Sequence, residues 1–321
     1  MEALLTHSVL SSLVILLMAI VADAVWRWPA AYHPLTLMQL LAARMGDKVL
    51  PGANHAPMQH YISGTLAAVV VVVPLVSLLG LLVYLAEYPV FFEAVILVAV
   101  LDYNHERYRF RQVLNSVGKN KKTLSRESVG YMVLRDCDRL TDIGIAKAAI
   151  EALLLKFYYH YVAVIFWFLL AGPIAALTYR LLLLLSWQWH PRRAGYQHFG
   201  MPVRKLVRLM HLLPSLIGAL CMLVVTAGGS ALKALKNAPA RDRTSLLLAA
   251  FAGGNHIRLG GPAFYAGRKT TPPRVGGARD VKYSDMVYCR RAITRAGILV
   301  ASLALLTLTV LAAITGQVSV P

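Results

Sequence analysis

Apolar residues dominate this chain in long runs that are separated by charged loops. Most runs approach or exceed the roughly 20 residues that an α-helix needs to cross a bilayer. The run at 89–101 is short, and the run at 148–189 is long enough for two passes that break at Gly172-Pro173. The pattern predicts an all-α polytopic integral membrane protein, with about five to seven membrane-embedded helices plus cytoplasmic amphipathic helices and loops. The runs occupy 4–26, 61–85, 89–101, 148–189, 209–227 and 298–314.

The composition agrees with this pattern. Of the 321 residues, 58% are hydrophobic and 15% are charged, which is too apolar for a soluble chain of this size. No Lys or Arg precedes the first run, and that run is longer than a signal-peptide core, so we interpret it as a retained anchor. Cys137, Cys221 and Cys289 show neither disulfide nor metal-ligand spacing, which predicts buried or reduced thiols.

The basic residues cluster beside the apolar runs. The formal net charge is +18, and 31 of the 33 Lys and Arg residues fall in four segments. Positively charged loops resist translocation, so these segments are expected in the cytoplasm. This distribution explains the charge without nucleic acid, while anionic membrane lipids or a phosphorylated small molecule remain suitable partners. We expect one membrane domain over 1–321, with cytoplasmic segments at 27–60, 102–147, 190–208 and 230–295.

The same charge rule orients the chain, with the N-terminus outside. The number of crossings then disagrees with the charge rule at 209–227, because a full crossing there would place the basic 230–295 segment outside. Either the 209–227 run is re-entrant and bends near His211 and Pro214, or the 148–189 run crosses once. We favour the re-entrant alternative, because Pro214 lies within one helical turn of His211.

Asp23 is the first polar residue with candidate chemistry. An acid inside an apolar run is costly unless it faces water or a partner, so it is a functional candidate by default. The alternative is an interfacial acid that pairs with Arg27, four residues further on. His33 follows in the first basic loop and gains interest only from its neighbours.

A second group begins at Arg135-Asp136. Arginine can bind an anion and aspartate a metal or an amine, although a surface ion pair is the simpler interpretation. Glu151 follows on a helix that runs toward the membrane, so it can border the same cytoplasmic pocket as Asp136. Lys156 and His160 are polar residues on an otherwise apolar, aromatic helix, where such side chains usually snorkel or contact a carbonyl.

The third group is the glycine-rich segment 258–267. Gly260 and Gly261 permit close backbone approach and can present amides to an anion, while Arg258 adds charge and Tyr265 a stacking face. A tight turn explains the same residues. The sequence contains no P-loop, zinc pattern, nucleophile elbow or dinucleotide fingerprint.

Taken together, these motifs resemble the CobD/CbiB family, the adenosylcobinamide-phosphate synthases of cobalamin biosynthesis. Order and spacing carry the resemblance through most of the chain. The motifs are Ala22-Asp23, Pro29 and His33-Pro34-Leu35; Arg135-Asp136 and Leu140; Ile150-Glu151-Ala152; Ala163 and Phe166-Trp167; Gly172 and Tyr179; Tyr196 and Phe199-Gly200; Leu213-Pro214; and Leu259-Gly260-Gly261-Pro262 with Tyr265 and Gly267.

The resemblance implies an enzyme of the bacterial inner membrane that joins an aminoalcohol phosphate to a carboxyl group of adenosylcobyric acid, a corrinoid. Such a ligation implies ATP and a divalent metal such as Mg²⁺. The expected pocket is bordered by Asp23, His33 and the other two groups. The resemblance then implies that Arg135 and Arg258 hold phosphate. Asp136 and Glu151 remain as catalytic or metal candidates, and Gly260, Gly261 and Tyr265 as substrate contacts.

The chain departs from the family pattern where several polar residues are expected. Apolar residues replace most of them, and Arg208 reverses a charge. These changes lean toward the AmpE branch, whose members are linked to regulation of β-lactamase, so a non-catalytic membrane regulator or ligand-binding protein is the alternative function. The departures are Leu155, Lys156 and Tyr159; Leu183-Leu184-Leu185-Ser186; Val207 and Arg208; His211; and Pro214-Ser215-Leu216.

Overall fold

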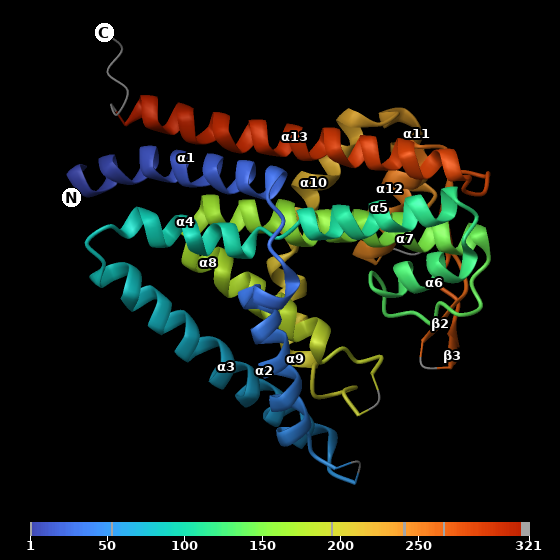
Figure 1. Ribbon diagram of the computed structural model, residues 1–321, viewed down its shortest axis with the longest axis horizontal. Helices are drawn as coiled ribbons and strands as arrows, with labels where there is room; N and C mark the ends of the chain where they lie inside the picture. The colour runs from blue at the N-terminus through green and yellow to red at the C-terminus, as the bar shows by residue number, and fades with distance from the viewer. Residues whose placement is uncertain (1, 53, 194, 240–241, 266, 316–321) are drawn as a thin grey trace. The chain divides into compact units, whose positions relative to one another are not determined.

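The computed structural model describes residues 2–52, 54–193, 195–239, 242–265 and 267–315, and it is mostly helical (Figure 1). The chain divides into two compact units. Unit 1 contains residues 1–102, 159–212 and 301–321, and unit 2 contains 103–158 and 213–300. Each unit is therefore assembled from segments far apart in the sequence.

Unit 1 holds most of the long apolar helices, together with a short 3-10 turn, η1. Its elements are α1 (Glu2–Val25), η1 (Ala30–Tyr32), α2 (Pro34–Val49), α3 (Pro57–Leu85), α4 (Pro89–Val100), α8 (Ala163–Gln188) and α9 (Met201–Met210). Three further helices pass from one unit to the other along the chain: the π-helix η2 (Phe157–Val162), α10 (Leu212–Val225) and α13 (Tyr283–Ile314).

Among the residues that the structure describes, three helical stretches are long and apolar enough to cross a membrane, namely α3, residues 142–188 and α13; the broken pair α9–α10 would make a fourth. Large apolar side chains stand exposed along α3, among them Leu66 and Val70, and along α13, among them Leu306. Exposed apolar faces of this extent match a lipid environment, since helices satisfy their own backbone groups there. The prediction of a multi-pass helical membrane protein agrees with these features.

The helix α8 contains a sharp reversal at Gly172. Ala171 and Gly172 leave helical geometry, and Gly172 has φ +76°, a left-handed value that favours glycine. His160 and Arg180 are then in contact, although twenty residues of straight helix would separate them by about 30 Å. The predicted break at Gly172-Pro173 is confirmed, and residues 159–188 form a helical hairpin.

A second predicted break also occurs. The helix α9 ends at Met210 and α10 begins at Leu212, so the interruption falls at His211. Pro214 lies in the first turn of α10, where proline is tolerated because the first amides of a helix have no helical acceptor. The break was expected within this turn, and whether the 209–227 run crosses or re-enters remains a matter of prediction.

Within unit 1, small residues of α2 pack against the end of α8. Trp189 is fully buried, and its Nε1 donates a hydrogen bond to the Ala42 carbonyl at 2.9 Å. A side chain at Gly46 would meet the Tyr196 hydroxyl and the Trp189 ring at less than 3 Å. The absence of bulk at Ala42 and Gly46 therefore lets α2 approach the aromatic end of the hairpin.

Unit 2 combines helices with two short antiparallel ribbons. Gly253 and Gly254 near the end of α12 allow close packing on α11, because a Cβ at Gly253 would meet the Ala234 Cβ at 2.3 Å. Residues 258–276, which include the glycine-rich segment 258–267, form these ribbons, which pair β1 with β4 and β2 with β3. The elements are α5 (Asn104–Gly118), α6 (Lys122–Gly130), α7 (Asp142–Lys156), α11 (Gly228–Lys236), α12 (Arg243–Gly254), β1 (Arg258–Gly260), β2 (Ala263–Tyr265), β3 (Arg268–Thr270) and β4 (Arg274–Gly276).

Candidate functional site

In unit 2, Arg135 and Glu151 form a largely buried ion pair. Thr141 caps α7 by accepting a hydrogen bond from the Gly144 amide at 3.1 Å, and Glu151 lies in the third turn of that helix. Arg135 stands in the preceding loop and donates from Nη2 to Glu151 Oε2. The two side chains are 13% and 11% exposed, so the pair is shielded from water and fixes the loop to the helix.

Glu151 also binds the glycine-rich segment. Its Oε1 accepts a hydrogen bond from the Gly260 amide at 2.7 Å. Gly260 has φ +74°, and a Cβ there would lie 2.3 Å from the Pro273 carbonyl. The fold itself therefore requires glycine at position 260, because the β1–β4 ribbon leaves no space there for a side chain. The amide that was expected to face an anionic ligand faces the Glu151 carboxylate instead.

Asp136 contacts a different part of the same segment. Its amide donates to the Phe264 carbonyl at 2.8 Å, and its Oδ2 accepts from the Gly267 amide at 2.9 Å. Arg258 donates to the Ala278 carbonyl, and Tyr265 is part-buried at the end of β2. The structure thus brings Arg135, Asp136 and Glu151 to the 258–267 segment, while Arg258 contacts backbone further along.

Cys137 directly follows Arg135 and Asp136 in the sequence. Burial raises the pKa of its thiol, against the opposing effect of the Arg135 charge, and the thiol donates to the Arg135 carbonyl at 3.2 Å. Cys137, Cys221 and Cys289 are all buried and free, as the prediction of buried thiols stated. A protonated, buried thiol is a packing group rather than a nucleophile.

A divalent metal does not fit these residues. Across the described ranges, no three His, Cys, Asp or Glu side chains gather as ligands. Asp136 and Glu151 each place a carboxylate oxygen on a backbone amide, and Glu151 also neutralises Arg135. Magnesium needs oxygen ligands in octahedral geometry, mostly carboxylates, phosphates and water. The two candidate carboxylates are therefore committed to the fold, and we assign no metal step to them.

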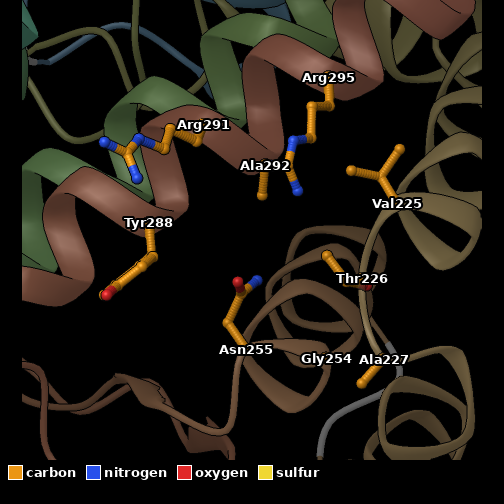
Figure 2. A pocket seen from close by; sticks show the side chains of 9 residues that line it. All are labelled: Val225, Thr226, Ala227, Gly254, Asn255, Tyr288, Arg291, Ala292 and Arg295. Atoms are coloured by element: carbon orange, nitrogen blue, oxygen red, sulfur yellow. The ribbon is translucent and has the colours of Figure 1, made fainter.

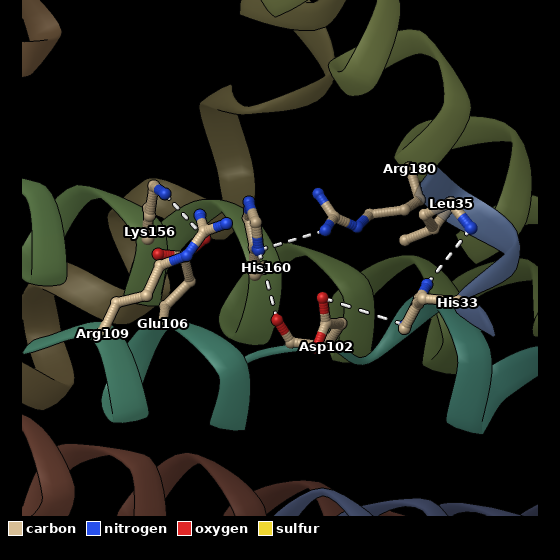
Figure 3. Close-up of polar contacts among 8 residues, drawn as sticks. All are labelled: His33, Leu35, Asp102, Glu106, Arg109, Lys156, His160 and Arg180. Atoms are coloured by element: carbon tan, nitrogen blue, oxygen red, sulfur yellow. Dashed lines mark hydrogen bonds and ion pairs between the residues drawn. The ribbon is translucent and has the colours of Figure 1, made fainter. Parts of the chain in front are cut away.

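Unit 1 contains the other two predicted residues. Asp23 is buried near the end of α1. His33 caps α2, since its Nδ1 accepts a hydrogen bond from the Leu35 amide at 3.1 Å. The remaining nitrogen of His33, Nε2, lies 3.8 Å from Asp102 Oδ2 (Figure 3). His33 thus has a structural role as a cap and an acidic neighbour that the sequence alone did not indicate.

Asp102 adjoins a buried His160–Arg180 contact within the same unit. Arg180 Nη2 lies 3.1 Å from His160 Nδ1 (Figure 3). The His160 ring stacks on Trp187, with the ring centroids 5.0 Å apart. His160 Nδ1 also lies 3.4 Å from the Asp102 carbonyl. Because guanidinium only donates, Nδ1 must accept from Arg180, and the longer contact to the carbonyl is not a hydrogen bond.

Sequence reasoning missed Asp102 and Arg180 as site residues. A signal for Arg180 existed, because Lys156 and Arg180 are the two basic residues that fall outside the four basic segments. A buried charge inside an apolar helix is a functional candidate by default. Asp102 carries no such signal, since it begins a charged segment, and only the fold reveals its contact with His33.

Two further polar contacts involve residues of the apolar run at 148–189. In unit 2, Lys156 Nζ lies 2.6 Å from Glu106 Oε1, and both side chains are largely buried. In unit 1, the Tyr179 hydroxyl lies 2.9 Å from the Tyr159 carbonyl and also contacts His211 Nε2. Lys156 therefore forms a buried ion pair and does not snorkel to the surface.

Exposed apolar helices and buried charged groups together define a multi-pass helical membrane protein with polar sites inside its units. A model of the family described as CobD/Cbib protein matches residues 16–294. The match covers most of the chain, and this protein belongs to the CobD/CbiB family. The family resemblance predicted from the motifs is confirmed.

Several curated relatives carry the description cobalamin biosynthesis protein CobD. The protein of Stutzerimonas stutzeri (strain A1501) is 28% identical over 261 residues, covering 80% of this chain and 85% of the relative. The protein of Chromobacterium violaceum is 25% identical over 301 residues, covering 92% and 96%. That of Sinorhizobium fredii (strain NBRC 101917 / NGR234) is 25% identical over 280 residues, covering 81% and 83%. No solved structure matches the chain.

Proposed function

We propose that this protein joins an aminoalcohol phosphate to a carboxyl group of adenosylcobyric acid, at the cytoplasmic face of the bacterial inner membrane. The observation that supports this proposal is the family match through residues 16–294, within which Arg135 and Glu151 form a preorganised pair at two family motifs. The proposal extends to the chain what the names of its relatives say more generally about cobalamin biosynthesis.

In this reaction the amine nitrogen forms an amide bond with the carboxyl carbon, and one carboxyl oxygen leaves. Bound ATP would supply the driving force, because that oxygen would leave as inorganic phosphate while ADP and a proton from the amine are released. The chain contributes Arg135, whose orientation Glu151 fixes, as a cation for the phosphate or carboxylate of a substrate. Arg258 is the second cation proposed for phosphate, and Asp23, His33, Gly261 and Tyr265 remain proposed substrate contacts.

A second candidate function is a non-catalytic, AmpE-like regulator or ligand-binding protein. The observation that favours it is the loss of carboxylates. Leu183-Leu184-Leu185-Ser186 and Val207-Arg208 stand where the resemblance calls for acids, and Asp136 and Glu151 are occupied by backbone amides and Arg135. Binding of an anionic ligand needs cations and amides, which the chain retains, whereas metal-assisted ligation needs more oxygen ligands.

We further propose the membrane arrangement that suits either function. The chain forms a single membrane domain with five to seven embedded helices and the N-terminus outside. The support is the positive charge of the four segments at 27–60, 102–147, 190–208 and 230–295, which favours the cytoplasm. Cysteine-accessibility labelling of single-Cys variants at one exposed position in each segment tests this arrangement, and labelling from outside at any of the four contradicts it.

Complementation separates the two candidate functions. The gene is expressed in a bacterium that lacks its own synthase and needs cobalamin made from cobyric acid for growth, with membrane expression verified by immunoblotting. Growth is expected with the native chain and strongly reduced growth with Arg135→Gln. Asp280→Asn, which removes an exposed charge of the same unit, serves as the control. No growth despite native expression levels contradicts the synthase proposal and favours the non-catalytic alternative.

A further inference from the structure

Unit 2 contains a hollow that none of the predicted site residues lines. Its volume is about 370 Å³, within the range of small-molecule sites. Three elements form its wall: the end of α10 with its following turn, the end of α12, and one face of α13 (Figure 2). The residues used below are Thr226, Ala227, Asn255, Tyr288, Arg291 and Arg295.

The face of α13 supplies two cations to this hollow. Tyr288, Arg291 and Arg295 are three and four residues apart, a spacing that places them along one side of a helix. Figure 2 shows the Arg295 guanidinium extending toward Asn255 across the hollow. In the part of the chain that the structure describes, neither Arg291 nor Arg295 has a hydrogen-bond or ion-pair partner. Like charges four residues apart repel, so an anion between them would be stabilising.

The opposite wall offers one hydrogen-bond donor, on Asn255, and no acid. Ala227, the N-cap residue of α11, lines this wall, but its amide already donates to the Gly254 carbonyl at 3.3 Å. Asn255 Nδ2 donates one of its two N–H groups to the Phe251 carbonyl at 2.8 Å. The Asn255 side chain faces the hollow, so the second N–H can donate to a ligand there. No Asp or Glu is among the lining residues.

The sequence that follows Arg295 indicates the level of the hollow relative to the membrane. After Arg295, α13 carries no charged residue as far as Ile314 and is mostly apolar, and α10 is likewise uncharged and mostly apolar up to its end at Val225. Arginines at the boundary between a charged and an apolar stretch of helix lie at the level of lipid phosphates. A solvated basic face would explain the arginines, but it would not explain the hollow beside them or the Asn255 amide group on its opposite wall.

We propose that this hollow binds a phosphate group at the membrane surface, carried by an anionic phospholipid or by a soluble phosphate ester. Arg291 and Arg295 bind its oxygens, with the Asn255 amide group opposite. The inference is independent of the synthase proposal, because it involves none of the residues assigned to that reaction.

The test measures binding to the full-length protein purified in a neutral detergent. One arm titrates inorganic phosphate and pyrophosphate, and the other titrates short-chain phosphatidylglycerol against phosphatidylcholine of equal chain length. Thermal stabilisation and calorimetry report binding. We expect saturable binding in at least one arm, and the arm that responds identifies the source of the phosphate.

Matched double variants make the result specific. Arg291→Gln/Arg295→Gln removes both cations of the hollow. Lys282→Gln/Arg290→Gln also removes two charges, one from the residue that precedes α13 and one from α13 itself, at positions that do not line the hollow. We expect at least a tenfold loss of affinity for the first variant and less than a twofold change for the second. Without ligand, the first variant should melt at or above the native temperature, because the repulsion between the arginines is gone.

Three results would overturn the proposal. The first is the absence of saturable binding in both arms. The second is an equal loss of affinity in the two double variants, which would show a diffuse surface charge. The third is a lower melting temperature of the unliganded Arg291→Gln/Arg295→Gln variant, with binding unchanged in the folded fraction, which would assign the arginines a purely structural role.

Discussion

Replacing Glu151 by glutamine tests the central contact of unit 2. The change keeps the shape of the side chain but removes the charge that faces Arg135. Glutamine has one acceptor oxygen, while Glu151 serves two donors, the Arg135 guanidinium and the Gly260 amide. In the variant one of these donors must therefore face the NH₂ group, and it becomes a buried donor without an acceptor.

The expected cost follows from burial. Breaking a buried ion pair by removing one partner costs about 3–5 kcal/mol. Both side chains are about nine-tenths buried, and the glutamine oxygen retains one hydrogen bond, so the lower end of that range applies. A loss of about 3 kcal/mol corresponds to a fall in melting temperature of roughly 6–12 °C for a chain of a few hundred residues.

The assay is thermal unfolding of the purified protein in detergent, with Asp280→Asn as the control. Asp280 pairs with Lys147 at 2.8 Å, but its side chain is 49% exposed, and exposed pairs contribute little. The control should melt within about 2 °C of the native protein. The double variant Arg135→Met/Glu151→Met should recover much of the loss, because it buries neither charge. If Glu151→Gln melts with the control, the buried pair does not stabilise this unit.

Three further changes test other contacts. Gly64→Ala should lower the melting temperature, because the added Cβ would lie 1.9 Å from the Phe199 carbonyl, whereas Gly80→Ala on the same helix meets no atom within 4 Å and should be neutral or stabilising. Lys156→Met should destabilise more than Lys156→Met/Glu106→Gln, measured by the same melts, because the single change leaves a buried carboxylate without its 2.6 Å partner. Burial and the nearby Arg204 lower the pKa of His190 to about 4. The unfolded chain then binds this proton more readily, so stability is full above pH 6.5 and falls toward pH 4, and melts of His190→Gln should lose part of that slope.

The outcomes of these melts also bear on the choice between the two candidate functions. A variant that fails to complement while melting like the native protein has lost an interaction with a ligand. Glu151→Gln is expected to lose stability as well, since its carboxylate holds Arg135 and Gly260. Arg135→Gln breaks the same buried pair and should also lose stability, so the informative variant is Arg135→Met/Glu151→Met. If this double variant melts near the native temperature and still fails to complement, the pair contacts a ligand; if it complements, the pair is structural.

The sequence by itself determined the class of this protein. Apolar runs of membrane length predict helices because backbone groups in lipid must bond within their own segment. Glycine at 172 and the His211–Pro214 turn predicted the two breaks, since these residues interrupt regular helix geometry locally. The order of short motifs from Asp23 to Gly267 was sufficient to indicate the family, which the match over 16–294 confirmed.

Tertiary structure decided what the polar residues contact. Arg180 meets His160 only because Gly172 reverses the chain, and Glu151 meets Gly260 across 109 positions of sequence. Such contacts depend on how helices pack, and no local periodicity encodes them. The hollow beside Arg291 and Arg295 arises in the same way, because its wall joins the ends of two helices to one face of a third.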